Sequence, residues 1–158
     1  QRQLFLTLIT SALVLACSAQ SSPAPDSPQP VDGWKKLSPA QTKIIEGCGT
    51  EPPFSGKYLK HKEKGVYTCA RCNTPLFQSK TKFDSRSGWP SFDAAIPGAV
   101  KEVLDKDGLR KEIRCARCDG HLGHVFRGER HTPRNTRHCV NSLALDFSSK
   151  PMAEAYFA

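Results

Sequence analysis

Three kinds of hydrophobic pattern follow one another along the chain. Residues 4–16 form an apolar run that is broken only by small hydroxyl residues. Ser38 and the proline after it, followed by Gly47 at the far end, predict a short helix, and we expect its Ile44 and Ile45 to face the core. After this helix the helical periodicity fades, and short alternating segments predict strands. The pattern therefore favours one mainly β domain with few short helices.

Two segments give the clearest strand signals. Asp107-Gly108 stands between apolar residues within positions 100–114, which predicts a β-hairpin whose turn needs a positive φ. Near the end of the chain an apolar series with partial alternation predicts one further strand through Val140, Leu143, Leu145 and Phe147. The 12 prolines and 11 glycines agree with many turns between short strands.

The N-terminal apolar run is too short to span a bilayer comfortably and is typical of a signal peptide. It ends at Ala16-Cys17, which resembles a bacterial lipobox, and the alternative is a buried apolar helix with an incidental cysteine. We expect a signal peptide at 1–16, a lipidated Cys17 with a flexible Ser/Pro tether at 17–33, a folded domain at 34–150 and a tail at 151–158. This predicts a periplasm-facing lipoprotein of the bacterial cell envelope. Ser18 after the cysteine favours the outer membrane.

The formal net charge of +8 is high enough to attract a polyanion such as nucleic acid or a membrane surface. However, acids interrupt the basic residues, and no aromatic stacking platform accompanies them. We therefore interpret the basic residues as solvated faces and expect no nucleic-acid partner. A basic zinc-binding module remains the alternative.

Seven cysteines in 158 residues carry most of the chemical information. Cys69-x-x-Cys72 and Cys115-x-x-Cys118 are two near-identical turns with the spacing that lets four thiolates hold one Zn²⁺ ion. A complete four-thiolate shell has no open position, so this ion would be structural. Two local disulfides, or the redox-active dithiol of a thiol-disulfide redox protein, are the alternatives.

Cys139 stands in the segment Arg137-His138-Cys139. Because neighbouring positive charge lowers the pKa of a thiol and raises the fraction of thiolate, this segment suggests a nucleophile. The alternative is an inert cysteine buried in a strand.

Three further segments reveal a resemblance: G-W-P-S-F at 88–92, G-H-L-G-H-V-F at 120–126 and R-H-C-V-N-S at 137–142. Together with the paired cysteine turns and G-T-E-P-P-F-S-G at 49–56, they resemble the B-type methionine sulfoxide reductases from about residue 34 to 147. The resemblance implies two antiparallel β-sheets with few helices and a zinc ion opposite the active site. It also implies reduction of the R-epimer of methionine sulfoxide, either protein-bound or free, by the domain at 34–150.

The same resemblance assigns roles to individual residues. It implies that Cys139 is the nucleophile and that Trp89 is the aromatic wall for the substrate's methyl group. It implies that the polar active-site groups are His121, His124 and Asn141, and that Phe126 and Arg137 are neighbouring pocket residues. A sulfoxide sulfur becomes a good electrophile only when its oxygen is protonated, and histidine can supply that proton near neutral pH. The alternative for the two histidines is a pair of zinc ligands or core residues.

Attack would leave Cys139 as a sulfenic acid that a second thiol must reduce. Many relatives have a cysteine directly before G-W-P-S-F, but this chain has Ser87. Cys48 is the remaining free thiol, and we expect the flanking Gly47 and Gly49 to let its loop swing inward. A passive surface thiol, with direct reduction by an external donor, is the alternative. The expected partners are oxidised proteins, a thioredoxin-like reductant and a membrane reached through the lipid anchor.

Overall fold

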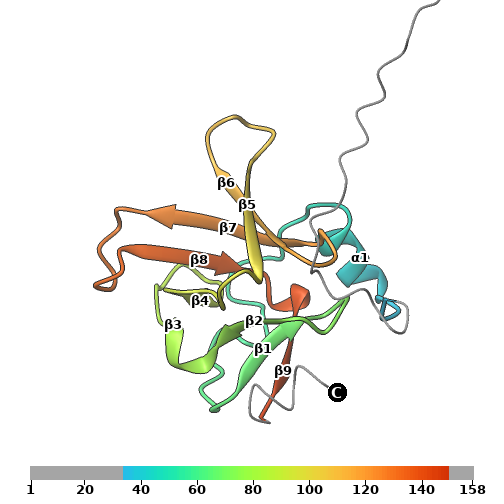
Figure 1. Ribbon diagram of the computed structural model, residues 1–158, viewed down its shortest axis with the longest axis horizontal. Coiled ribbons are helices and arrows are strands. Elements are labelled where there is room, and N and C mark those ends of the chain that lie inside the picture. Colours follow the sequence, from blue (N-terminus) through green and yellow to red (C-terminus); the bar gives the residue numbers. More distant parts are fainter. Residues whose placement is uncertain (1–33, 150–158) are drawn as a thin grey trace, which may run out of the picture.

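The computed structural model describes residues 34–149, which form two antiparallel β-sheets and one short α-helix (Figure 1). The helix is α1 (Pro39–Ile45), and two 3₁₀ turns cover Ser79–Thr81 and Ser142–Ala144. The smaller sheet has the order β2 (Pro75–Gln78), β1 (Val66–Cys69), β9 (Leu145–Ser148). The larger sheet has the order β3 (Lys82–Phe83), β4 (Ser91–Phe92), β8 (Thr136–Val140), β7 (His121–Arg127), β6 (Lys111–Cys115), β5 (Val100–Leu104). The predicted mainly β architecture is confirmed.

Helix α1 forms where the sequence predicts it. Ser38 caps the helix, because its hydroxyl accepts a hydrogen bond from the Gln41 backbone at 3.3 Å while the Gln41 side chain accepts one from the Ser38 backbone at 3.0 Å. Ile44 and Ile45 are buried, as expected. The helix therefore packs one apolar edge on the domain and turns its polar residues to solvent.

The predicted hairpin is also confirmed as β5 and β6. Gly108 adopts a φ of 70° at the turn, which a residue with a Cβ rarely adopts. The Asp107 carboxylate accepts hydrogen bonds from the backbone amides of Leu109 and Arg110 at 2.8 and 2.9 Å. These bonds close the turn and set the register of the two strands.

The prediction of one continuous strand near the end of the chain is wrong. The strand that contains Val140 belongs to the larger sheet, and Leu145 opens β9 in the smaller one. The 3₁₀ turn between them is held by the buried carboxylate of Glu51, which accepts hydrogen bonds from the backbone amides of Ser142 and Leu143 at 2.6 and 3.1 Å. Apolar alternation cannot show this change of sheet, because both halves of the segment are buried.

Aromatic side chains from both sheets meet in the core. Phe77 of β2 stacks on Phe92 of β4 with ring centroids 4.4 Å apart, and Tyr67 of β1 meets the same Phe92 ring edge-on at 5.0 Å. Each of these rings is fully buried, which contributes about 1.5–3 kcal/mol per side chain. The packing fixes β4, and β4 pairs with β8 in the larger sheet.

One row of residues crosses all six strands of the larger sheet. Its members are register partners in turn: Phe83, Ser91, Cys139, His124, Glu112 and Val103. Directly opposed residues of antiparallel strands share a face of the sheet. Cys139 therefore lies near the middle of the sheet, with a histidine on one side and a serine on the other.

Within residues 34–149 no helix has the length and apolar character needed to cross a bilayer. The predicted signal peptide, Cys17, the tether and the tail at 151–158 lie outside the described residues.

Candidate active site and metal centre

Cys139 is the next-to-last residue of β8 and is half-buried. Strand alternation turns its side chain to the same face as that of Arg137, while the His138 side chain points to the opposite face. The His138 ring is buried, with Nδ1 3.1 Å from the Phe92 carbonyl oxygen. Burial lowers the pKa of His138. The sequence-based expectation that His138 supplies positive charge beside the thiol is therefore wrong.

The Cys139 thiol has a raised pKa. Burial is the largest cause, and the Arg137 guanidinium and the Ser87 hydroxyl beside the sulfur lower the pKa without cancelling it. The expected lowering is thus overturned by desolvation, which sequence neighbours do not reveal. At neutral pH the resting thiol carries its proton, so it brings one proton to any reaction in which it becomes a nucleophile.

A fork of two hydrogen bonds fixes the guanidinium next to Cys139. Nε and Nη2 of Arg137 donate to the two carboxylate oxygens of Glu129 at 2.7 and 2.8 Å. The same guanidinium lies over the ring of Phe126, 4.4 Å from its centroid. The sequence reasoning missed Glu129, and the only available signal was one acid within the basic run at 127–137.

His121 and His124 are three residues apart on β7, yet their rings meet edge-on with centroids 5.7 Å apart. A regular strand would turn them to opposite faces, but the register shift between β6 and β7 removes the alternation there. Gly123 lies between them with φ 155°, and a Cβ at this position would overlap the carbonyl oxygen of Cys139. Glycine therefore lets β7 approach β8 at the nucleophile.

Each histidine has an acidic partner. His121 Nδ1 lies 2.6 Å from a carboxylate oxygen of Glu112, and His124 Nε2 lies 2.7 Å from Asp105. Burial lowers the pKa of His121 despite its acidic partner. Burial opposes ionisation of Glu112, but hydrogen bonds from Arg114 and His121 outweigh it and lower that pKa. His121 is thus a neutral ring that donates from Nδ1.

This tautomer leaves a lone pair on His121 Nε2. The atom is buried and has no hydrogen-bond partner among the described residues. A buried acceptor without a partner is costly and marks a position where a donor is expected. Sequence reasoning missed Glu112 and Asp105 because they come from β6 and from the turn after β5.

A third group of contacts holds Trp89 and Asn141 in place beside the site. The Trp89 indole donates to the Glu51 carbonyl oxygen at 3.0 Å, and the Glu51 amide donates to the Asn141 side chain at 3.0 Å. The other end of the Asn141 side chain donates to the Leu122 carbonyl oxygen at 3.1 Å. Asn141 therefore engages both ends of its amide in backbone contacts, and it positions the segment after Cys139.

Cys48 lies directly after α1 and is exposed. Its sulfur is 3.7 Å from the Arg114 guanidinium and lies in one cluster with Glu112 and His121. Burial of the sulfur and the nearby Glu112 raise the pKa of the Cys48 thiol. Cys48 therefore approaches the histidine side of the site, and both it and Cys139 are free thiols in this structure.

The glycines beside Cys48 shape the end of the helix. A Cβ on Gly47 or Gly49 would come within 2.6 or 2.7 Å of the Lys43 carbonyl oxygen. The Gly49 amide donates to that same carbonyl at 3.1 Å, which ends the helix. The two glycines thus permit a tight helix end, and the inward swing of the Cys48 loop stays a prediction.

The four remaining described cysteines meet in one buried cluster. The Sγ atoms of Cys69 and Cys118 are 3.6 Å apart, and so are those of Cys72 and Cys115. A disulfide requires about 2.05 Å, whereas a tetrahedral ion with Zn–S bonds of about 2.3 Å places its sulfurs about 3.8 Å apart. The cluster therefore fits a four-thiolate zinc site and excludes two local disulfides in this structure. It contains no histidine.

A family model described as the SelR domain matches residues 37–149, which contain every helix and strand described above. Peptide methionine sulfoxide reductase B5 of Oryza sativa subsp. japonica is 53% identical over 117 residues, 73% of this chain and 86% of that protein. Peptide methionine sulfoxide reductase B7 of Arabidopsis thaliana is 50% identical over 137 residues, 85% of this chain and 95% of that protein. The chloroplastic B2 protein of the same plant is 51% identical over 133 residues, 82% of this chain and 66% of that longer protein.

Proposed function

The chain belongs to the SelR-domain family of B-type peptide methionine sulfoxide reductases, and we propose that it reduces the R-epimer of methionine sulfoxide through Cys139. The observation that carries this proposal is the setting of the Cys139 thiol. The thiol lies between the Ser87 hydroxyl and the Arg137 guanidinium, and the row across the sheet places His124 directly opposite it. These groups surround one nucleophile with hydrogen-bond donors.

In the proposed reaction the Cys139 sulfur attacks the sulfoxide sulfur while the sulfoxide oxygen accepts a proton. The thiol loses its proton, the S–O bond of the substrate breaks, and oxygen passes to the cysteine as a sulfenic acid. Methionine leaves reduced, and the cysteine sulfur is oxidised by two electrons. Because the resting thiol is protonated, it supplies a proton that His121 Nε2 can hold and return to the oxygen.

The residues around the Cys139 sulfur contact different parts of the substrate. The Trp89 ring forms an apolar wall for the substrate's methyl group, held in place by Glu51. The Arg137 guanidinium lies over Phe126, so cation and ring form a second wall. A sulfoxide has one oxygen and one methyl group on a chiral sulfur, and walls of different polarity can discriminate between its epimers.

Regeneration requires a second thiol, and we assign it to Cys48. The Cys48 sulfur attacks the sulfenic sulfur, water leaves, and the resulting disulfide is reduced by a thioredoxin-like dithiol. The two sulfurs must approach to about 2.05 Å, so the segment after α1 has to move. The Cys48 sulfur interacts with the Arg114 guanidinium at 3.7 Å and with the Glu112 carboxylate, and both contacts have to be exchanged.

A Cys48→Ser variant tests this step. We expect one turnover, a stable Cys139 sulfenic acid and loss of the intramolecular disulfide seen by mass spectrometry in the wild type. Normal turnover with a thioredoxin-like donor, together with no disulfide in the wild type, would remove Cys48 from the pathway.

We assign one structural Zn²⁺ ion to the cluster of Cys69, Cys72, Cys115 and Cys118. The ion would link the end of β1 to the end of β6 and thereby join the two sheets. A closed shell of four thiolates leaves no position for substrate, so the metal takes no part in the redox step.

We also propose that Cys17 carries a lipid that anchors the enzyme in the bacterial envelope, where it repairs oxidised proteins. The support is the sequence pattern at 4–17 alone. Replacing Cys17 by Ser should move the protein from the membrane to the soluble fraction of cells. Mass spectrometry of the mature N-terminus should find an acylated Cys17.

A stereochemically resolved assay tests the function as a whole. Wild-type enzyme should reduce methionine-R-sulfoxide and leave the S-epimer untouched, and Cys139→Ser should reduce neither. Turnover of the S-epimer, or activity in the Cys139 variant, contradicts the proposal.

A further inference from the structure

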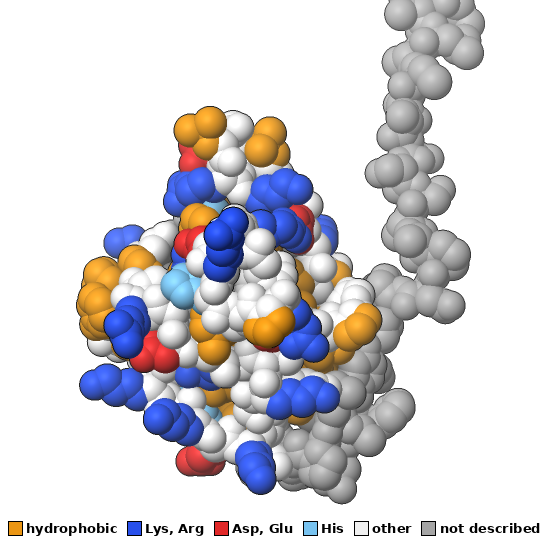
Figure 2. Space-filling model, turned by 90° about the vertical axis from the view of Figure 1, so that its left-hand side faces the viewer, with side chains coloured by type: hydrophobic (Ala, Val, Ile, Leu, Met, Phe, Trp, Pro, Cys, Tyr) orange, Lys and Arg blue, Asp and Glu red, His pale blue; other side chains and the backbone are white. Residues whose placement is uncertain are grey.

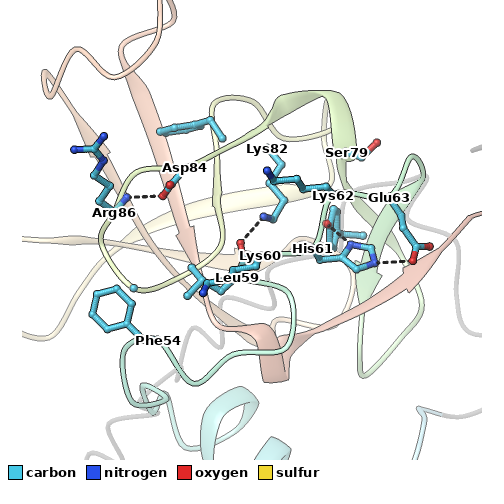
Figure 3. A pocket seen from close by; sticks show the side chains of 13 residues that line it. Phe54, Leu59, Lys60, His61, Lys62, Glu63, Ser79, Lys82, Asp84 and Arg86 are labelled. Carbon is cyan, nitrogen blue, oxygen red and sulfur yellow. Dashed lines mark hydrogen bonds and ion pairs between the residues drawn. The ribbon is translucent and has the colours of Figure 1, made fainter.

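Figure 3 shows a hollow of about 780 Å³, and its lining includes Gly88, which directly precedes Trp89 of the candidate active site. Its walls come from residues 54–63, before β1, and from residues 79–88, which lead through β3 to the active-site segment. We call it the basic pocket, because its charged lining is Lys60, Lys62, Lys82 and Arg86 against Glu63 and Asp84. None of the residues assigned to the sulfoxide reaction lines it.

The cations of the basic pocket are available to a ligand. Among residues 34–149, the side chains of Lys60, Lys62 and Arg86 make no ion pair, whereas Arg134 and Arg137 each hold a carboxylate. Basic side chains are spread over the whole face that Figure 2 shows, with acidic ones among them. Unpaired charges that line a concave surface raise the local concentration of an oppositely charged ligand.

The two acidic side chains of the basic pocket lie close to hydrogen-bond donors that belong to the protein itself. The Asp84 carboxylate accepts a hydrogen bond from the Arg86 backbone amide at 2.9 Å, and Glu63 lies 3.9 Å from the His61 ring (Figure 3). Across the hollow, Lys82 donates to the Leu59 carbonyl oxygen at 2.8 Å and ties the two walls together. With four cations against two acids in its lining, the pocket has an excess of positive charge.

Aromatic rings add an apolar rim. Phe54 is 69% exposed, and its backbone amide donates to the Gly88 carbonyl oxygen at 2.8 Å, directly before Trp89. Phe83 lines the other wall and is half-buried. A rim of rings around cations suits a peptide, which brings both apolar and charged side chains.

The register of the larger sheet gives the distance from the pocket to the nucleophile. Phe83 pairs with Ser91, and Ser91 pairs with Cys139. Two strand spacings amount to about 10 Å, and an extended peptide covers that length with about three residues.

From these observations we propose that the basic pocket binds acidic side chains of the protein substrate, about three residues from the oxidised methionine. The inference rests on the proposed function and specifies its substrate class: methionine sulfoxide in acidic segments of polypeptides. The occupant is a peptide rather than a lipid surface because the cations line a hollow that opens beside the active-site segment.

Three peptides test the proposal. Each carries a central methionine-R-sulfoxide, with Glu, Gln or Lys at the third position on both sides. At low salt we expect kcat/KM for the Glu peptide to exceed that for the Gln peptide by about 5-fold, because complementary charge accelerates encounter. The Lys peptide should have the lowest kcat/KM. In 0.5 M NaCl the differences in kcat/KM among the three peptides should disappear.

Lys60→Gln combined with Lys62→Gln should bring the Glu and Gln peptides to within about 2-fold of each other. Lys36→Gln combined with Lys43→Gln is the matched control, since it removes the same charge near α1 and should preserve the preference. Equal turnover of the three wild-type peptides, or the same loss in the control, overturns the proposal. An unchanged peptide preference in the pocket variant, together with weaker binding of that variant to phosphatidylglycerol vesicles, also overturns the proposal.

A binding measurement separates this proposal from the proposed function. Fluorescence anisotropy with the unoxidised Glu peptide should give tighter binding to wild type than to the pocket variant, whether or not the enzyme turns over. If the Gln peptide is not reduced at all, the proposed function fails and the anisotropy result still decides on the pocket.

Discussion

The backbone carbonyl of Glu51 accepts a hydrogen bond from the Trp89 indole, while the Glu51 side chain holds the turn that follows Cys139. One buried residue thus connects the proposed methyl-binding wall to the segment of the nucleophile. Its carboxylate accepts two backbone amides, and its own amide reaches Asn141.

Glu51→Gln should lower kcat by about tenfold and the free energy of unfolding by about 1–3 kcal/mol, because the new NH₂ group leaves a buried donor without an acceptor. Steady-state kinetics and urea unfolding measure the two effects. Ser38→Ala is the control, since loss of this helix cap costs about 1 kcal/mol far from the site and should preserve kcat. A turnover number equal to that of wild type would show that Glu51 has no positioning role.

Gly123→Ala should destabilise the domain by about 1–3 kcal/mol and reduce activity, because its Cβ overlaps the Cys139 carbonyl and forces β7 away from β8. Gly98→Ala is the matched control: Gly98 also has a positive φ, of 75°, but nothing lies within 4 Å of the added Cβ. Urea unfolding of both variants separates backbone strain from the steric clash. Similar losses in the two would argue that the close approach of the strands is unimportant.

The pH dependence of Cys139 follows from its raised pKa. Iodoacetamide labelling of this residue, followed by mass spectrometry in a Cys48→Ser background, should reach half its maximal rate above the ordinary thiol pKa of 9.0. Arg137→Gln should move the midpoint further up, because the guanidinium lowers this pKa. A midpoint near neutral pH in the wild type would contradict the burial argument.

The raised pKa of Cys139 also makes the free energy of unfolding depend on pH. Folding favours the protonated Cys139 thiol, so its contribution is complete below the unfolded pKa and is lost as the pH rises through the folded one. The free energy of unfolding of wild type should therefore fall more steeply above pH 9 than that of Cys139→Ser, as measured by urea unfolding from pH 7 to 10.

Removal of the proposed zinc should abolish the cooperative unfolding transition. A zinc-selective chelator, or Cys72→Ser, takes away the link between β1 and β6, and the folding free energy supplied by the metal is lost with it. Metal analysis should find one zinc per chain in wild type and in the control Cys48→Ser. A metal-free protein that unfolds as wild type does would exclude a structural ion.

Ser87→Cys should create a second route of regeneration. The Ser87 hydroxyl already lies beside the Cys139 sulfur, so a thiol there could condense with the sulfenic acid without movement of the segment after α1. In a Cys48→Ser background we expect a disulfide between 87 and 139 and restored turnover with a thioredoxin-like donor. If peptide mapping finds no such bond, the two side chains are less close than the structure places them.

Local signals in the sequence predicted local structure well. The N-terminal cap of α1 at Ser38, the hairpin turn at Gly108 and the two cysteine turns were predictable because each is encoded within a few residues. The mainly β class followed from the alternating segments, and the family followed from its motifs.

Features assembled from distant strands could not be predicted. The acidic partners of the two histidines come from other strands and turns, and the register shift that brings the rings together depends on pairing with β6. The direction of the Cys139 pKa was misread because sequence shows the neighbouring charge of Arg137 but not the depth of burial.

The crossing of the chain from β8 into β9 also sets an order of events during synthesis. Strand β9 covers one side of β1, and Cys139 enters the larger sheet only just before that crossing. A growing chain on the ribosome can offer all four sulfurs of the metal cluster well before residues 136–148 emerge. The Cys139 thiol is therefore among the last parts to find its partners, because pairings between residues far apart in sequence form slowly.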